Sequence, residues 1–135
     1  MSKRSRKLWI AVLAMTPALV ADGPRAGAPV TTGLGADEAG VRYGQALGAM
    51  AVCRGVQVTI EARMLRARFQ GPQLELFDRR AAEVSPLWAR MASCVEAPEI
   101  NMCRLVKERN CMDAEAQIGP RGSAIPRLIE MIREE

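Results

Sequence analysis

The chain has 135 residues, of which 19 are Lys or Arg, 15 are Asp or Glu, four are Cys and none is His. This length fits one domain, and the lack of histidine excludes histidine-based catalytic triads and the common histidine-containing metal sites. Four of the basic residues precede position 8, so the rest of the chain carries 15 basic and 15 acidic residues and gives no charge-based reason to expect a nucleic acid as partner.

Residues 1–21 have the pattern of a signal peptide. The four basic residues are followed by an uninterrupted apolar run over residues 8–21. This run is shorter than the roughly 20 residues that span a hydrocarbon core, and it contains Pro17. We therefore expect cleavage after Ala21, a periplasmic or secreted protein, and no stable membrane anchor after cleavage.

Residues 22–35 contain four glycines and two prolines without an apolar period, and we expect them to form a flexible lead-in. A single helical domain is expected over residues 36–135, with Asp37 capping its first helix. One long helix is predicted over residues 36–69, because apolar residues recur there at helical spacing. The β-branched residues near position 58 fall inside this period, so no strand is predicted. The apolar positions are Tyr43, Leu47, Met50, Cys53, Ile60 and Met64.

After Gly71-Pro72, residues 74–95 form the most regular apolar stripe, with Pro86 either kinking one helix or starting a second. A third helix is predicted over residues 99–117, and Ser123 can cap a short last helix. The apolar side of that last helix comprises Ile125, Leu128, Ile129 and Ile132. The predicted fold is all-α: a small disulfide-stapled bundle of about four helices around a long antiparallel pair, formed by the first two helices.

An even number of cysteines in an exported chain favours two disulfides. Cys103 and Cys111 lie about 12 Å apart along the third helix, too far for a direct bond. Two pairings remain, and Cys53–Cys111 with Cys94–Cys103 is slightly favoured over Cys53–Cys103 with Cys94–Cys111. A redox pair or a zinc site is the alternative, but no Cys-x-x-Cys motif is present.

Two other groups of residues are candidate sites. Gly40, Gly44 and Gly48 form a ladder of small residues, interpreted either as a docking face for a partner or as close packing within the bundle. Five arginines near the tip of the predicted hairpin could bind an anion, although nearby carboxylates and the helix dipole offer a structural explanation. These arginines are Arg63, Arg66, Arg68, Arg79 and Arg80.

No residues with the spacing of a catalytic, metal or cofactor site occur in the sequence, so we expect a non-catalytic protein without a cofactor. The function expected is binding of another protein, as an accessory or inhibitory factor. One alternative is a carrier of a small apolar ligand between its helices, which requires a cavity. The other alternative is a thiol-disulfide redox protein, which requires an accessible and easily reduced bridge.

Overall fold

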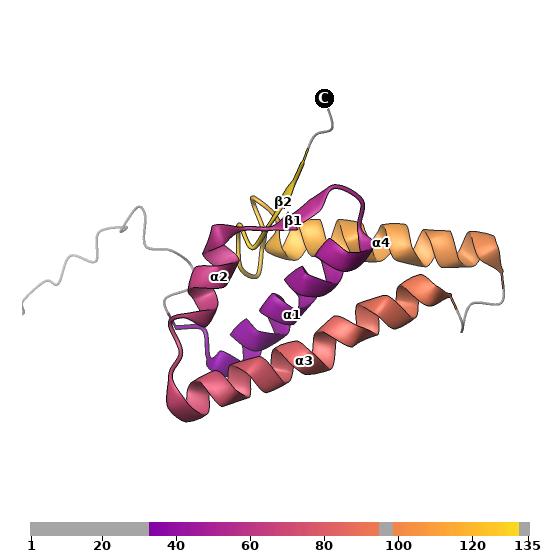
Figure 1. Cartoon of the computed structure of the whole chain (residues 1–135). Helices are drawn as coiled ribbons and strands as arrows, with labels where there is room; N and C mark the ends of the chain where they lie inside the picture. The colour runs from indigo at the N-terminus through magenta and orange to yellow at the C-terminus, as the bar shows by residue number, and fades with distance from the viewer. Residues whose placement is uncertain (1–32, 95–98, 133–135) are drawn as a thin grey trace, which may run out of the picture.

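The computed structural model describes residues 33–94 and 99–132, so the predicted signal peptide and most of the predicted lead-in lie outside the described residues. This part of the chain is mainly helical, with a small two-stranded sheet (Figure 1). The elements in chain order are α1 (Ala36–Val52), β1 (Val56–Val58), α2 (Ile60–Arg66), α3 (Gly71–Ser93), α4 (Ile100–Ile118) and β2 (Ile129–Met131).

α1 and α3 form the most extensive contact between elements, and they run parallel to each other. The ladder Gly40, Gly44 and Gly48 faces successive turns of α3 from Phe77 to Trp88 in the same direction along both helices. A Cβ atom on Gly44 would lie only 2.6 Å from the carbonyl oxygen of Ala81. Glycine is therefore needed here for the two helices to approach, and the predicted antiparallel pairing of these helices is wrong.

The predicted single helix over residues 36–69 is also wrong, because the chain turns at its middle. α1 ends at Val52, Gly55 adopts a positive φ of 73°, and the β-branched residues that follow form β1. The Thr59 hydroxyl then accepts a hydrogen bond from the backbone N–H of Ala62 and caps α2. β1 and α2 return the chain to the beginning of α1, which explains why α3 can run parallel to α1.

The short last helix predicted from Ser123 is absent, and the chain forms turns and β2 there instead. Several backbone N–H groups after α4 bond to its last carbonyl groups, for example Ala124 to Gln117 at 2.9 Å and Leu128 to Ile118 at 2.9 Å. These bonds satisfy the open carbonyl end of α4 and leave the segment no helical hydrogen-bonding pattern. β2 then pairs antiparallel with β1, with Val56 opposite Met131.

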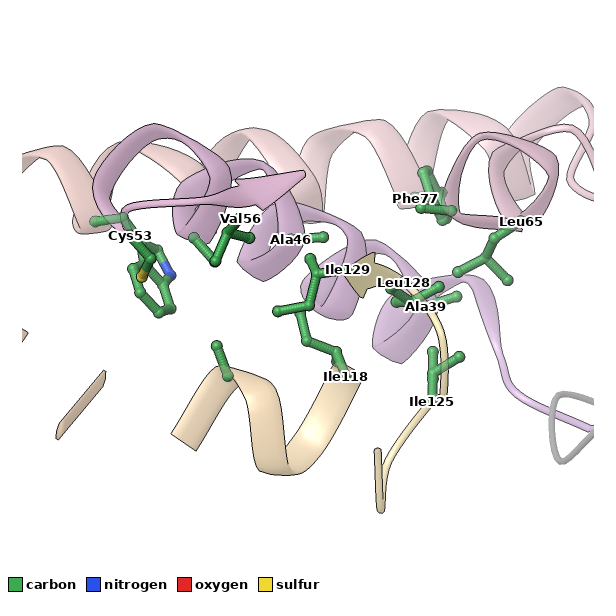
Figure 2. Close-up of a cluster of buried hydrophobic side chains, with 14 of the residues drawn as sticks. Ala39, Ala46, Cys53, Val56, Leu65, Phe77, Ile118, Ile125, Leu128 and Ile129 are labelled. Atoms are coloured by element: carbon green, nitrogen blue, oxygen red, sulfur yellow. The ribbon is translucent and has the colours of Figure 1, made fainter. Parts of the chain in front are cut away.

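The apolar core lies between α1, α2, α3, α4 and the segment that leads into β2. Figure 2 shows Ile118, Ile125, Leu128 and Ile129 grouped beside α1, and each of these side chains is at most 2% exposed. The last three were predicted on the apolar side of a helix, and they are buried although that helix is absent. Ile132, assigned to the same face, is 45% exposed.

α3 is one continuous helix of 23 residues that contains Pro86, so the alternative of two helices is excluded. The apolar stripe predicted over residues 74–95 is buried at Phe77, Ala81 and Trp88. Two of the methionines assigned to the first stripe are instead exposed, Met50 by 46% and Met64 by 60%. The exposure of Met64 follows from the break after Val52, because α2 does not continue the buried face of α1.

Candidate functional site

Two disulfides join α4 to the rest of the molecule. Cys53–Cys111 connects the end of α1 to the middle of α4, and Cys94–Cys103 connects the end of α3 to the first turns of α4. This is the pairing favoured from the sequence. Disulfides are typical of proteins that fold in an oxidising compartment.

Both bridges combine one buried and one partly exposed cysteine. Cys53 and Cys103 are each 7% exposed, whereas Cys94 and Cys111 are intermediate. The two bridges thus do not differ in the way that would single out one as an accessible redox centre. Among the described residues, no three Cys, Asp or Glu side chains lie close enough together to hold a metal ion.

The glycine ladder does not form an exposed docking face. Gly40, Gly44 and Gly48 are buried against α3 of the same chain. The structure therefore contradicts the interaction-face interpretation and agrees with close packing inside the domain. A partner would have to separate α1 from α3 to reach these residues.

The five arginines do not form one free cationic cluster. Arg66 makes a bidentate ion pair with Asp78, with Nε–Oδ1 and Nη2–Oδ2 distances of 2.8 and 2.7 Å. Arg80 pairs with Glu83 at 2.6 Å and with Asp37 at 2.7 Å. The hydrogen bond from Arg66 lowers the pKa of Asp78, and the Asp78 carboxylate raises the pKa of Arg66. These pairs neutralise two of the five charges that an anion site would use.

A polar cluster fixes the other end of α4 against α1. The Arg42 guanidinium donates to the side-chain oxygen of Gln117 at 2.5 Å and to that of Gln45 at 3.2 Å. Gln45 also donates to the Gln117 oxygen at 3.2 Å. These groups are partly buried and hydrogen-bonded to one another, which is typical of a structural network. The partners are more than 70 positions apart, so no spacing in the sequence indicates this network.

An open groove of about 510 Å³ lies where the sheet meets α4. Its apolar lining consists of Val56, Met112 and Met131 together with the Cys53–Cys111 bridge. Its charged lining consists of Arg54, Arg104, Lys107, Glu108 and Glu115. The volume is in the range of small-molecule and peptide-side-chain sites. Because β1, β2 and the middle of α4 are distant in sequence, their apolar residues gave no common signal.

α4 exposes more large apolar side chains than any other described element. Met102, Leu105 and Met112 are 49%, 55% and 65% exposed, and Ile100 is 90% exposed. The buried residues of this helix are only Cys103, Ala114 and Ile118. The first half of α4 extends past the end of α1, as Figure 1 shows, so α1 does not cover it.

No helix within residues 33–94 and 99–132 is sufficiently long and apolar to cross a membrane. Comparison of the chain with protein-family models, with curated proteins and with solved structures finds no match. Among the described residues, the groove and the exposed side of α4 are the candidate binding surfaces.

Proposed function

We propose that this protein is an exported, non-catalytic binding protein that contacts another macromolecule through the groove between the two-stranded sheet and α4. The observation that carries the proposal is the apolar floor of this groove, formed by Val56 and Met131 beside the Cys53–Cys111 bridge. Charged residues of both signs surround that floor, the arrangement of an interface with an apolar centre and a polar rim.

The fold provides a rigid support for this surface. The disulfide fixes the distance between the end of α1 and α4, and the β1–β2 pairing fixes Val56 opposite Met131. A preformed groove loses little conformational entropy when a partner binds. The partner expected is a protein segment with one or two apolar side chains, flanked by groups that pair with the charges of the rim.

Site-specific photo-crosslinking in the exporting cell tests this proposal. A benzophenone amino acid replaces Met131, which is 48% exposed in the groove, and in a matched control it replaces Met64, which is 60% exposed on α2. We expect one adduct of defined mass from position 131 and none from position 64. Equal adducts from both positions, or none from position 131, would contradict a specific protein site in the groove.

The alternative of a small apolar ligand is supported by the groove volume of about 510 Å³. A carrier of this kind would retain its ligand during gentle purification, and native mass spectrometry would show a mass above that of the chain. Replacement of Met131 by Glu would remove the added mass, whereas Met64→Glu would not. A mass equal to that of the oxidised chain alone, with a positive crosslink at position 131, would favour the protein partner.

A further inference from the structure

The side of α4 that faces away from the core carries a row of exposed residues at alternating steps of three and four. The row comprises Met102, Leu105, Arg109, Met112 and Ala116. On an α-helix this spacing places all five on one side, opposite Cys103, Ala114 and Ile118. We call this set the outer row.

The outer row has nearly the same order when read from either end. Arg109 occupies its middle, with two apolar residues before it and two after it. A second α4 that runs in the opposite direction would therefore place Leu105 against Met112 of the second copy, and Met102 against Ala116 of the second copy. A surface that matches itself under a two-fold rotation is the requirement for a symmetric dimer.

The charges at the middle of the outer row are also self-complementary. Arg109 has no ion pair among the described residues, and its neighbour Glu108 has only a long contact of 3.7 Å with Arg104. A two-fold axis near positions 108 and 109 would bring Arg109 of each copy close to Glu108 of the other. This arrangement forms two ion pairs, one for the Arg109 of each copy. It also lets each Arg109 side chain lie between the flanking apolar residues.

We infer that α4 mediates an antiparallel, two-fold homodimer through the outer row, with the axis close to Arg109. The contact is short, at about four turns of one helix, so the dimer belongs to the weak or transient class of interfaces. This inference goes beyond the proposed function, and the residues that it uses share only Met112 and Glu108 with the lining of the groove.

Sedimentation velocity over a concentration series tests the association. The wild-type chain is expected to shift from monomer to dimer as its concentration rises into the high micromolar range. Leu105→Glu buries a carboxylate in the contact and is expected to weaken dimerisation at least about tenfold. Met64→Glu changes a residue of similar exposure on α2 and should leave dimerisation unchanged. A wild-type chain that stays monomeric throughout would overturn the inference.

Cysteine crosslinking tests the geometry. Arg109→Cys should form an intermolecular disulfide under mild oxidation, because the axis brings the two copies of this residue together. Arg104→Cys should not, because its two copies would be separated by about 15 Å along the helices. Crosslinking from position 104 but not from 109 would contradict the stated axis. The Met131 photo-crosslink reports the groove separately, so either proposal can fail while the other holds.

Discussion

The α1–α3 pair and α4 are held in place by different means. α1 buries seven of its 17 residues, all of them Gly or Ala, in a contact so close that a Cβ at Gly44 would collide with α3. α4 is longer, at 19 residues, yet it buries only three and is bonded covalently at two points. Close packing thus stabilises the first region, whereas disulfides compensate for little packing in the second. A helix supported in this way can keep apolar side chains exposed for binding.

The largest expected effect on stability comes from removing the disulfide between residues distant in sequence. Cys53→Ser with Cys111→Ser opens a link between residues 58 apart, whereas Cys94→Ser with Cys103→Ser opens one between residues 9 apart. Chain entropy predicts losses of about 4 and about 3 kcal/mol in the free energy of unfolding. Urea denaturation of the two double variants measures this difference. Equal losses would indicate that loop length does not determine the contribution of each bridge.

The close contact of α1 and α3 can be broken with one added side chain. Gly44→Val inserts atoms into the space held by Ala81 and should lower the free energy of unfolding by about 3 kcal/mol. Ala51→Val, at an exposed position of the same helix, controls for the poor helix propensity of valine. Thermal denaturation followed by circular dichroism compares the two. Similar midpoints would show that α3 does not require a glycine at position 44.

A smaller effect on stability is expected at Thr59, whose side chain joins the start of α2 to the segment that leads into β2. Its hydroxyl donates to the carbonyl oxygen of Arg127 at 2.6 Å and caps α2. Thr59→Val keeps the shape but loses both bonds, so we expect a loss of about 1–2 kcal/mol in the free energy of unfolding. Thr59→Ser retains the hydroxyl and should recover most of it. Equal stability of the two variants in urea would exclude a role for these bonds.

The smallest effect concerns the exposed pair of Arg66 and Asp78. Because Arg66 lowers the pKa of Asp78, the pair stabilises the fold above the ordinary carboxyl pKa of 3.8. This contribution is lost as the pH falls through the lowered pKa of the folded protein. Unfolding measured between neutral and acidic pH should therefore show a slightly weaker acid dependence in Asp78→Asn than in the wild type. An unchanged dependence would mean that solvent screens the pair completely.

Regular apolar spacing and cysteine geometry made much of the fold predictable. The stripe of α3 is buried at Phe77, Ala81 and Trp88, and the separation of Cys103 from Cys111 along α4 left two disulfide pairings, one of which the structure contains. Both inferences use neighbours within one helix. Residue spacing along one helix is sufficient for features that depend on that helix alone.

The incorrect predictions concern segments whose structure depends on residues that are distant in sequence. Val56–Val58 forms a strand because residues 129–131 pair with it, and this pairing overrides a helical period that continues across the turn. The direction of α3 relative to α1 depends on that same turn. The groove likewise combines the sheet with α4, so no sequence window contains it. The outer row lies on one helix, so its spacing can be recognised in the sequence. Its exposure to solvent cannot, because exposure depends on which other elements pack against α4.

Amide hydrogen exchange of the oxidised and the reduced protein tests most directly whether disulfides, rather than packing, hold α4 in place. In the oxidised protein, we expect protection in both α1 and α4. After reduction, the amides of residues 104–112 should lose protection, whereas those of residues 44–49 in the α1–α3 contact should retain it. Loss of protection in both helices together, or in neither, would contradict the account, because both regions would then be stabilised as one unit.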